Sequence, residues 1–175
     1  EYLATFIPTL IVTDAKVIQD YYMKKHKTAS VMIAYGADCT QISETGTLQK
    51  MGLERRDYLL YVSRFEPENN VHLVIEAYRQ VETSMPLVLV GHAPYSAAYI
   101  RRLREMADER VLFPGAIYGD DYLELRSHAY AWVQSTEVGG THPALLEAMG
   151  AGNCILAKKT PEHYEVLEDA GLYFE

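Results

Sequence analysis

The alternation of short apolar runs with longer amphipathic segments is the feature that most constrains this sequence. From residue 57 onward, runs such as Tyr58-Leu-Leu-Tyr-Val62 and Leu87-Val-Leu-Val90 are continuously apolar, as strands buried on both faces are. Between the runs lie segments such as 71–78, whose apolar residues share one helical face. This pattern favours a β-α-β chain with a parallel sheet.

The pattern predicts six strands, at residues 58–62, 87–90, 111–113, 131–134, 154–157 and 172–174. Helices are expected at 71–78, at 96–106, from a cap at Asp120 or Asp121 through 125, at 143–149, and from a Thr160-Pro161 start to Gly171. Parallel strands with helices on both faces make a Rossmann-like α/β domain over residues 57–175.

The first part of the chain predicts a smaller unit of the same kind. A strand at 10–13, a helix capped by Asp14 that runs to about Lys25, and a strand at 31–34 form one β-α-β unit within residues 1–40. So small a unit buries its own faces poorly, and we expect it to pack on another part of the protein. Residues 41–56 are polar with weak periodicity, which is typical of a linker or a short helix.

Composition excludes several classes of function. The net charge is -8, and no stretch clusters lysine and arginine densely enough to follow a phosphate backbone, so nucleic-acid binding is not expected. The apolar runs are shorter than the ~20 residues that span a bilayer. Two cysteines, Cys39 and Cys154, are too few for a disulfide scaffold or a structural zinc site, which favours a reducing, cytoplasmic compartment. The chain starts at Glu1 without Met and stops as a strand begins, so we expect it to be part of a longer protein.

The loop after the fourth large strand is the richest in candidate site residues. Two adjacent glycines, Gly139 and Gly140, permit close approach of the backbone to a ligand. A helix starting at Pro143 favours an anion at its N-terminus, and carboxylates at Glu137 and Glu147 suit sugar or ribose hydroxyls. A tight turn with acidic residues near a helix start explains the same residues without a ligand, and both interpretations stay open.

The loop after the first large strand carries Arg64, which could hold a diphosphate through charge-assisted hydrogen bonds. An exposed arginine paired with Glu66 or Glu68 is the alternative. His92 and His142 suit either ligand contacts or solvated loops. We predict no metal site, and the sequence lacks the GxGxxG fingerprint of a dinucleotide dehydrogenase.

Three segments together resemble a known family. They are YLLYVSRFEPEN at 58–69, VLFPGAI at 111–117 and EVGGTHPALLEAMGAG at 137–152. They are similar to the donor-binding half of GT-B retaining glycosyltransferases of the large family-4 type (group 1), which build surface polysaccharides from nucleotide sugars. The similarity covers residues 57–175, and residues 10–38 resemble the last β-α-β unit of the N-terminal acceptor lobe.

The resemblance implies roles for particular residues. Arg64 would bind the donor diphosphate, Glu147 the ribose hydroxyls, and the backbone near Ala116 and Ile117 the base. Glu137 would contact the donor sugar. The implied donor site comprises Arg64, Ile117, Glu137, Gly139, Gly140, Thr141, His142 and Glu147, with Arg64 and Glu137 catalytic and no metal or other cofactor.

Two positions depart from the family pattern. Asn69 stands where the family usually has a lysine, and Lys158 or Lys159 is a candidate to replace that cation. Nine residues separate Glu137 from Glu147, which is wider than usual, and the usual position of the first glutamate falls on Gly139. The segments at 66–70 and 138–149 resemble a subgroup that contains rhamnosyltransferases, which favours a dTDP-rhamnose-type donor.

The resemblance implies transfer of a sugar from a nucleoside diphosphate to an acceptor hydroxyl with retention. The implied partners are the nucleotide-sugar donor, a glycan or lipid-linked acceptor and the N-terminal lobe, and this chain alone is expected to bind nucleotide without turnover. The implied location is cytoplasmic, with peripheral association at the inner membrane face as an alternative. Two other functions stay open: a GT-B nucleotide-sugar epimerase, and a non-catalytic sugar-nucleotide-binding module.

Overall fold

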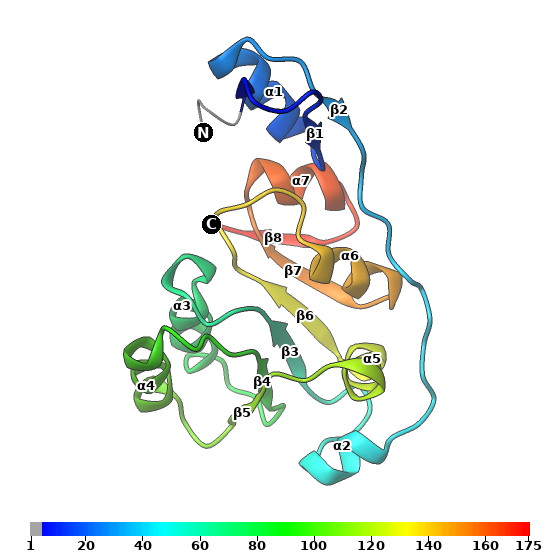
Figure 1. Cartoon of the computed structure of the whole chain (residues 1–175). Helices are drawn as coiled ribbons and strands as arrows, with labels where there is room; N and C mark the ends of the chain where they lie inside the picture. Colours follow the sequence, from blue (N-terminus) through cyan, green and yellow to red (C-terminus); the bar gives the residue numbers. More distant parts are fainter. Residues whose placement is uncertain (1–4) are drawn as a thin grey trace.

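The computed structural model describes residues 5–175, so the first four residues of the predicted 1–40 unit lie outside the described part. A small unit at one end holds two parallel strands, β1 (Val12–Thr13) and β2 (Val31–Met32), joined by helix α1 (Lys16–His26). An extended segment, 33–45, runs from this unit along one side of the molecule to α2 (Gly46–Met51) at the far end (Figure 1).

The larger unit is built on a parallel sheet, and the predicted fold class is confirmed. Its strands are β3 (Leu59–Val62), β4 (Leu87–Val90), β5 (Val111–Gly115), β6 (Ala131–Gln134), β7 (Cys154–Lys158) and β8 (Leu172–Phe174). They lie in the order β5-β4-β3-β6-β7-β8, and every neighbouring pair is parallel. All four residues of β4 and of β6 are buried, as expected for central strands covered on both faces.

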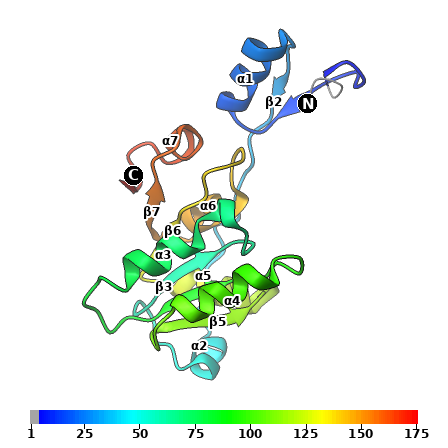
Figure 2. The same cartoon turned by 90° about the vertical axis from the view of Figure 1, so that its left-hand side faces the viewer.

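Helices cover the two faces of this sheet, and each face has its own apolar core (Figure 2). The helices are α3 (Val71–Tyr78), α4 (Ala97–Met106), α5 (Gly119–His128), α6 (Pro143–Gly150) and α7 (Pro161–Leu167), with a short 3-10 turn at Pro67–Asn69. Alternate strand residues supply the two cores: Leu60 and Val88 pack with α2, α5, α6 and α7, whereas Tyr61 and Leu89 pack with α3 and α4. Each fully buried large side chain stabilises the fold by about 1.5–3 kcal/mol.

Two predicted helix starts are wrong. Asp14 does not cap α1, whose N-cap is Ala15; instead the Glu165 carboxylate of α7 accepts hydrogen bonds from the first two backbone N–H groups of α1. Asp120 and Asp121 lie inside the first turn of α5, where a negative charge is favoured by the helix dipole, and they do not cap it.

The other ends are a mixture of confirmed and corrected predictions. Thr160 does cap α7, since its hydroxyl accepts from the His163 N–H at 3.2 Å. Gly171 does not end that helix, which stops at Leu167. Strand β5 continues through Pro114 and Gly115, because an edge strand tolerates a residue without an N–H.

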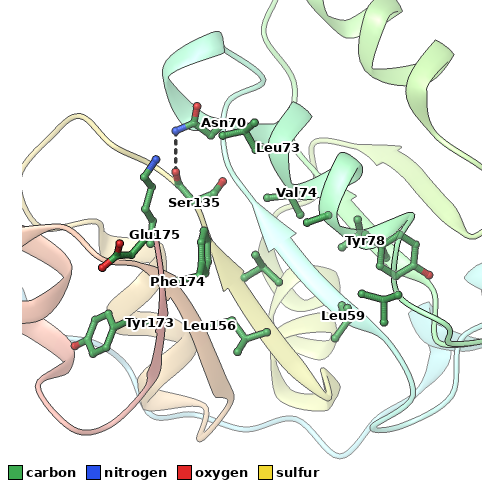
Figure 3. Close-up of a pocket in the computed structure, with 15 residues that line it drawn as sticks. Leu59, Asn70, Leu73, Val74, Tyr78, Ser135, Leu156, Tyr173, Phe174 and Glu175 are labelled. Atoms are coloured by element: carbon green, nitrogen blue, oxygen red, sulfur yellow. Dashed lines mark hydrogen bonds between the residues drawn. The ribbon is translucent and has the colours of Figure 1, made fainter.

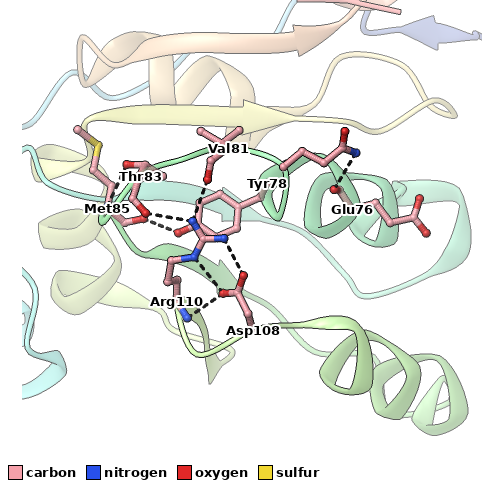
Figure 4. A network of polar contacts seen from close by, with 8 residues as sticks. Glu76, Tyr78, Val81, Thr83, Met85, Asp108 and Arg110 are labelled. Atoms are coloured by element: carbon pink, nitrogen blue, oxygen red, sulfur yellow. Dashed lines mark hydrogen bonds and ion pairs between the residues drawn. The ribbon is translucent and has the colours of Figure 1, made fainter.

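A polar network closes the amino-terminal edge of the sheet (Figure 4). Arg110, just before β5, donates to the carbonyls of Val81 and Thr83 at 2.9 and 3.0 Å and pairs with the Asp108 carboxylate at 2.7 Å. Its guanidinium also lies 4.7 Å from the ring centroid of Tyr78. Arg110 therefore fastens the α3–β4 loop to β5, and hydrogen bonding to it lowers the pKa of Asp108.

One face of the sheet carries an apolar cavity of about 450 Å³ between α3 and β8 (Figure 3). Its apolar walls include Leu59, Val74, Leu156 and Phe174. A hydrogen bond from Asn70 to the Ser135 carbonyl lies at its upper rim in that view. Asn70, Ser135 and Lys158 also line the cavity, so one end of it lies next to the carboxyl ends of the strands, where the predicted site residues gather.

Candidate functional site

The centre of the site is the point where the strand order reverses. Strands β3 and β6 are neighbours, but the chain leaves β3 toward β4 on one side and continues from β6 toward β7 on the other. In open α/β sheets, ligands bind outside the carboxyl ends of the strands at such a switch point. The loops that follow β3 and β6 carry the predicted residues Arg64 and Glu137, respectively.

Several hydrogen bonds join these two loops. Asn70 donates to the Ser135 carbonyl at 3.1 Å, and the Ser135 hydroxyl donates to the Asn69 carbonyl at 2.7 Å. The Glu137 N–H donates to the Glu68 carbonyl at 3.3 Å. The structure therefore brings together the two loops that the sequence singled out separately.

Asn69 stabilises the conformation of the β3 loop through hydrogen bonds. It is buried, its amide donates to the Arg64 carbonyl at 2.6 Å, and its own carbonyl accepts from the Tyr61 hydroxyl at 2.6 Å. Burial raises the pKa of Tyr61 to about 12, so this phenol stays protonated and donates. A position that carries a lysine in the resembled family is thus occupied here by an amide whose side chain bonds to the backbone of its own loop.

Arg64 itself projects into solvent, with 77% of its side-chain surface exposed. Its guanidinium lies 3.9 Å from the Glu66 carboxylate, at the long end of the range for an ion pair. An exposed pair of this kind contributes little to stability. The side chain is therefore available to an incoming anion.

Glu137 forms an ion pair with Lys158, which lies at the end of β7 with 19% of its side chain exposed. The hydrogen bond from Lys158, and then that from Asn70, lower the pKa of the Glu137 carboxyl. Glu137 is therefore ionised at neutral pH and holds a cation at the carboxyl edge of the sheet. Lys159, the other candidate cation, points elsewhere and pairs with Glu175 at 3.6 Å.

The glycine loop touches the small N-terminal unit. A Cβ on Gly140 would lie 2.7 Å from an Asp14 carboxylate oxygen, so the absence of a side chain permits this approach. The Thr141 hydroxyl donates to the Asp14 carbonyl at 3.2 Å. Gly139 has φ of 141°, a conformation that suits glycine. Asp14, predicted as a helix cap, instead faces the loop predicted to hold phosphates.

His142 is the N-cap of α6, and Pro143 is the first residue of that helix. The N–H groups of Leu145 and Leu146 both donate to the His142 carbonyl, at 2.9 and 3.4 Å. Fewer backbone N–H groups at the start of α6 are therefore free to bind an anion than the sequence predicted. Any anion held here must rely more on the N–H groups of the preceding glycine loop.

The His142 ring packs against His163, with 5.3 Å between ring centroids. Burial lowers the pKa of both histidines, and for His142 the neighbouring His163 lowers it further. His163 Nδ1 bonds to the Lys158 carbonyl at 2.7 Å, while its buried Nε2 has no hydrogen-bond partner within residues 5–175. A proton on Nε2 would therefore be buried without an acceptor.

We expect this pair to make the fold sensitive to mild acid. Both folded-state pKa values lie below the ordinary value of 6.5, so below pH 6.5 the unfolded chain binds more protons. The free energy of unfolding should fall as the pH decreases through that region, and His163→Gln should flatten the fall. Urea unfolding at pH 7.5 and 5.5 measures this, with the exposed His92→Gln as control. An unchanged pH dependence in His163→Gln would contradict it.

Glu147 lies on α6 with about a third of its side chain exposed. Its Oε2 accepts from the Tyr122 hydroxyl at 2.7 Å and lies 3.9 Å from Arg126 Nη1. Ile117 lies on the loop between β5 and α5, half-buried against the same apolar core as Tyr122. The loop after β5 therefore lies next to α5, the helix whose Tyr122 and Arg126 contact Glu147.

Sequence reasoning missed three residues that shape this site, Gly91, Tyr122 and Arg126, and it identified Asn69 only as a departure from the family pattern. Gly91 follows β4 directly and approaches the β3 backbone so closely that a Cβ there would lie 1.8 Å from the Ser63 carbonyl oxygen. A glycine placed directly after a buried strand was the available signal. For Arg126, the signal was a charged residue that continues the buried face of a helix.

Neither a helix that could span a membrane nor a cluster of three metal-binding side chains is present in the described residues. Over residues 5–175, no helix is long and apolar enough to cross a membrane. In the same range, no three side chains of His, Cys, Asp or Glu gather as a metal ion would require.

Comparisons with known proteins identify a family and a curated relative. The family model described as glycosyl transferases group 1 matches residues 56–175. The O-antigen chain mannosyltransferase B of Escherichia coli is 29% identical over 131 residues, which are 71% of this chain and 34% of that protein. The chain thus spans about a third of the length of that curated relative.

Solved structures share the fold. Anabaena HepE in complex with UDP-glucose aligns with 98% of this chain and 51% of its own, with a TM-score of 0.86 and 21% identity. A glycosyltransferase from Rickettsia africae aligns with 95% of this chain and 49% of its own, with a TM-score of 0.84 and 13% identity. The fold is therefore that of about half of a GT-B glycosyltransferase, and the chain spans about half the length of these neighbours.

Proposed function

This chain belongs to the group 1 glycosyl transferases, and we propose that it is the donor-binding part of an enzyme that transfers a sugar from a nucleoside diphosphate to an acceptor hydroxyl. The observation that carries the proposal is the hydrogen-bonded junction of the β3 and β6 loops at the strand-order reversal. That junction sets Arg64 and the Glu137–Lys158 pair at the carboxyl edge of the sheet, where a donor is expected.

In this proposal the donor lies across the ends of the strands. Arg64 binds the diphosphate, helped by N–H groups of Gly140 and Thr141, and Glu147 accepts hydrogen bonds from the ribose hydroxyls. The backbone near Ile117 meets the base. Glu137 contacts the donor sugar, and Lys158, which the pair with Glu137 holds at this edge, supplies the cation that Asn69 cannot.

The proposed reaction breaks the bond between the anomeric carbon and the diphosphate oxygen and forms a bond from that carbon to the acceptor oxygen, with retention. The acceptor proton leaves to a phosphate oxygen of the departing diphosphate or to a base outside this chain. Negative charge builds on the diphosphate as it departs. Fixed cations at that point stabilise the transition state more than the ground state, and no metal is needed in this scheme.

The relatives favour a role in glycan synthesis. The Escherichia coli relative is named as an O-antigen chain mannosyltransferase, and the Anabaena neighbour was solved with UDP-glucose. We propose that the acceptor is a growing glycan, with the acceptor lobe supplied by the rest of the protein. The rhamnosyltransferase resemblance adds dTDP to the donors that require testing.

Titration calorimetry with UDP, GDP and dTDP tests the proposal. We expect one of them to bind, and Glu147→Ala to weaken that binding about tenfold or more, because a hydrogen bond to a charged group contributes roughly 1.5–3 kcal/mol. Glu76→Ala, which removes an exposed carboxylate from α3, is the matched control and should bind as the wild type does. Failure of a folded protein to bind any of the three would contradict the proposal.

The two alternative functions predict different products. A GT-B nucleotide-sugar epimerase would convert a nucleotide sugar in the absence of any acceptor, whereas a transferase would leave it unchanged until an acceptor is added. A non-catalytic binding module would bind the nucleotide and convert nothing under either condition. Incubation of the intact protein with the nucleotide sugar, with and without acceptor glycan, separates the three.

A further inference from the structure

Arg126 is a buried charge that needs an explanation. Only 1% of its side chain is exposed, and it lies on α5 beneath the site. Burying a guanidinium costs several kcal/mol unless it is paired and hydrogen-bonded. Within residues 5–175, the carboxylate within 4 Å of it is that of Glu147, 3.9 Å from Nη1.

One other nitrogen of the guanidinium, Nη2, bonds to the extended segment that joins the two units, whereas the buried Nε has no hydrogen-bond partner within residues 5–175. Nη2 donates to the carbonyl of Thr40 at 3.2 Å and to that of Asp38 at 3.4 Å. The next two residues of α5 hold the same segment: the Ser127 hydroxyl accepts from the Ile42 N–H at 3.0 Å, and His128 Nε2 lies 3.0 Å from the Glu44 carbonyl. Arg126 is the member of this triplet that also reaches Glu147.

Tyr122, one helical turn before Arg126, contacts the same carboxylate oxygen. Its hydroxyl donates to Glu147 Oε2 at 2.7 Å, and its ring centroid lies 5.8 Å from the Arg126 guanidinium carbon. Burial, and then the hydrogen bond to Glu147, raise the pKa of Tyr122, so the phenol remains a donor at any physiological pH. Both contacts fall on Oε2, and within the described residues no hydrogen bond reaches Oε1.

We propose that Tyr122 and Arg126 are positioning residues that hold Oε2 of Glu147 and thereby aim its Oε1 at the ribose. This inference rests on the proposed function, since it takes Glu147 as the ribose acceptor. The hydrogen bond from Tyr122 and the ion pair with the buried Arg126 both fall on one oxygen of Glu147, and they restrict the rotation of its carboxylate before the ligand arrives. The ordering cost is then already met by the fold, which strengthens the bond to the ligand.

The test compares each nucleotide with its 3′-deoxy counterpart. Calorimetry is done with UDP, GDP and dTDP and with the 3′-deoxy form of each. The Kd of the 3′-deoxy nucleotide divided by that of its parent measures the contribution of the ribose 3′-hydroxyl to binding. We expect a ratio of about ten or more in the wild type, close to one in Glu147→Ala, and about threefold below wild type in Tyr122→Phe and in Arg126→Lys. The 3′-deoxy nucleotide should bind all four proteins within about twofold.

Tyr58→Phe is the matched control. Tyr58 is fully buried and its hydroxyl donates to the Leu125 carbonyl of the same helix, so its loss costs stability without touching Glu147. Its ratio should remain that of the wild type. Thermal unfolding identifies which variants are folded. If Arg126→Lys does not fold, the ratio measured for Tyr122→Phe tests the positioning role by itself.

The outcomes separate this inference from the proposed function. A full ratio in folded Tyr122→Phe, or equal weakening of parent and 3′-deoxy nucleotide, overturns the positioning role while leaving Glu147 as the ribose ligand. A full ratio in Glu147→Ala overturns the positioning role together with the ribose role of Glu147. Absence of binding by the folded wild type to all three nucleotides overturns the proposed function as well.

Discussion

Arg64→Ala should reduce sugar transfer by about 100- to 1,000-fold, as expected when a group that stabilises developing charge is removed. The guanidinium lies at the end of the central strand, is largely exposed and has only a distant contact with Glu66. It therefore contributes to the departure of the diphosphate and hardly to the fold. Initial rates of transfer by the intact enzyme, with nucleotide sugar and acceptor both saturating, measure the effect.

Stability provides the internal check on that prediction. Because the Arg64 side chain is exposed, the free energy of unfolding should change by less than about 0.5 kcal/mol. Arg101→Ala removes an exposed arginine from α4 and should alter neither rate nor stability. A transfer rate within a few-fold of wild type in Arg64→Ala would show that Lys158 or the glycine loop carries the diphosphate charge instead.

The strands and the fold class could be predicted from the sequence because their signal is local. Four or five consecutive apolar residues identify a strand buried on both faces, and the run at 87–90 coincides with β4. Helix α3 likewise spans its predicted residues 71–78. The order of strands follows from topology, since parallel strands joined by helices leave few alternatives.

The ends of helices were predicted less well because distant residues determine them. The first N–H groups of α1 are satisfied by Glu165, which lies far along the chain, and no local pattern around Asp14 indicates this. The same holds for α5. It continues to His128, past its predicted end at 125, because Arg126 and Ser127 are held by the extended segment at 40–42.

The candidate site divides in the same way. The loops that carry Arg64 and Glu137 could be predicted, because ligands in such sheets bind beyond the carboxyl ends of the strands. What Asn69 does could not be predicted, since it depends on contacts with Tyr61 on β3 and with Ser135 in the loop after β6. Side chains that act through another residue, as we propose for Tyr122, leave no motif in the sequence.

Gly91 has a larger structural effect than its sequence context suggests. It follows β4, and its N–H donates to the Gly115 carbonyl at 2.9 Å, which keeps the end of β4 paired with β5. On its other side, a Cβ would lie 1.8 Å from the Ser63 carbonyl oxygen and 2.9 Å from a ring carbon of Phe65. The Ser63 oxygen is backbone, so no rotation of a side chain can relieve the overlap.

Gly91→Ala should therefore lower the free energy of unfolding by at least about 3 kcal/mol, since the end of β3 must move to make room. Ser63 precedes Arg64, so nucleotide binding should weaken in whatever fraction remains folded. Urea unfolding followed by circular dichroism measures the first effect. Gly46→Ala is the matched control: nothing lies within 4 Å of its added Cβ, and alanine at this helix start should be neutral or slightly stabilising. Equal stability of Gly91→Ala and the wild type would mean that β3 and β4 do not approach each other at this point, and that the β3 loop owes its shape to Asn69 alone.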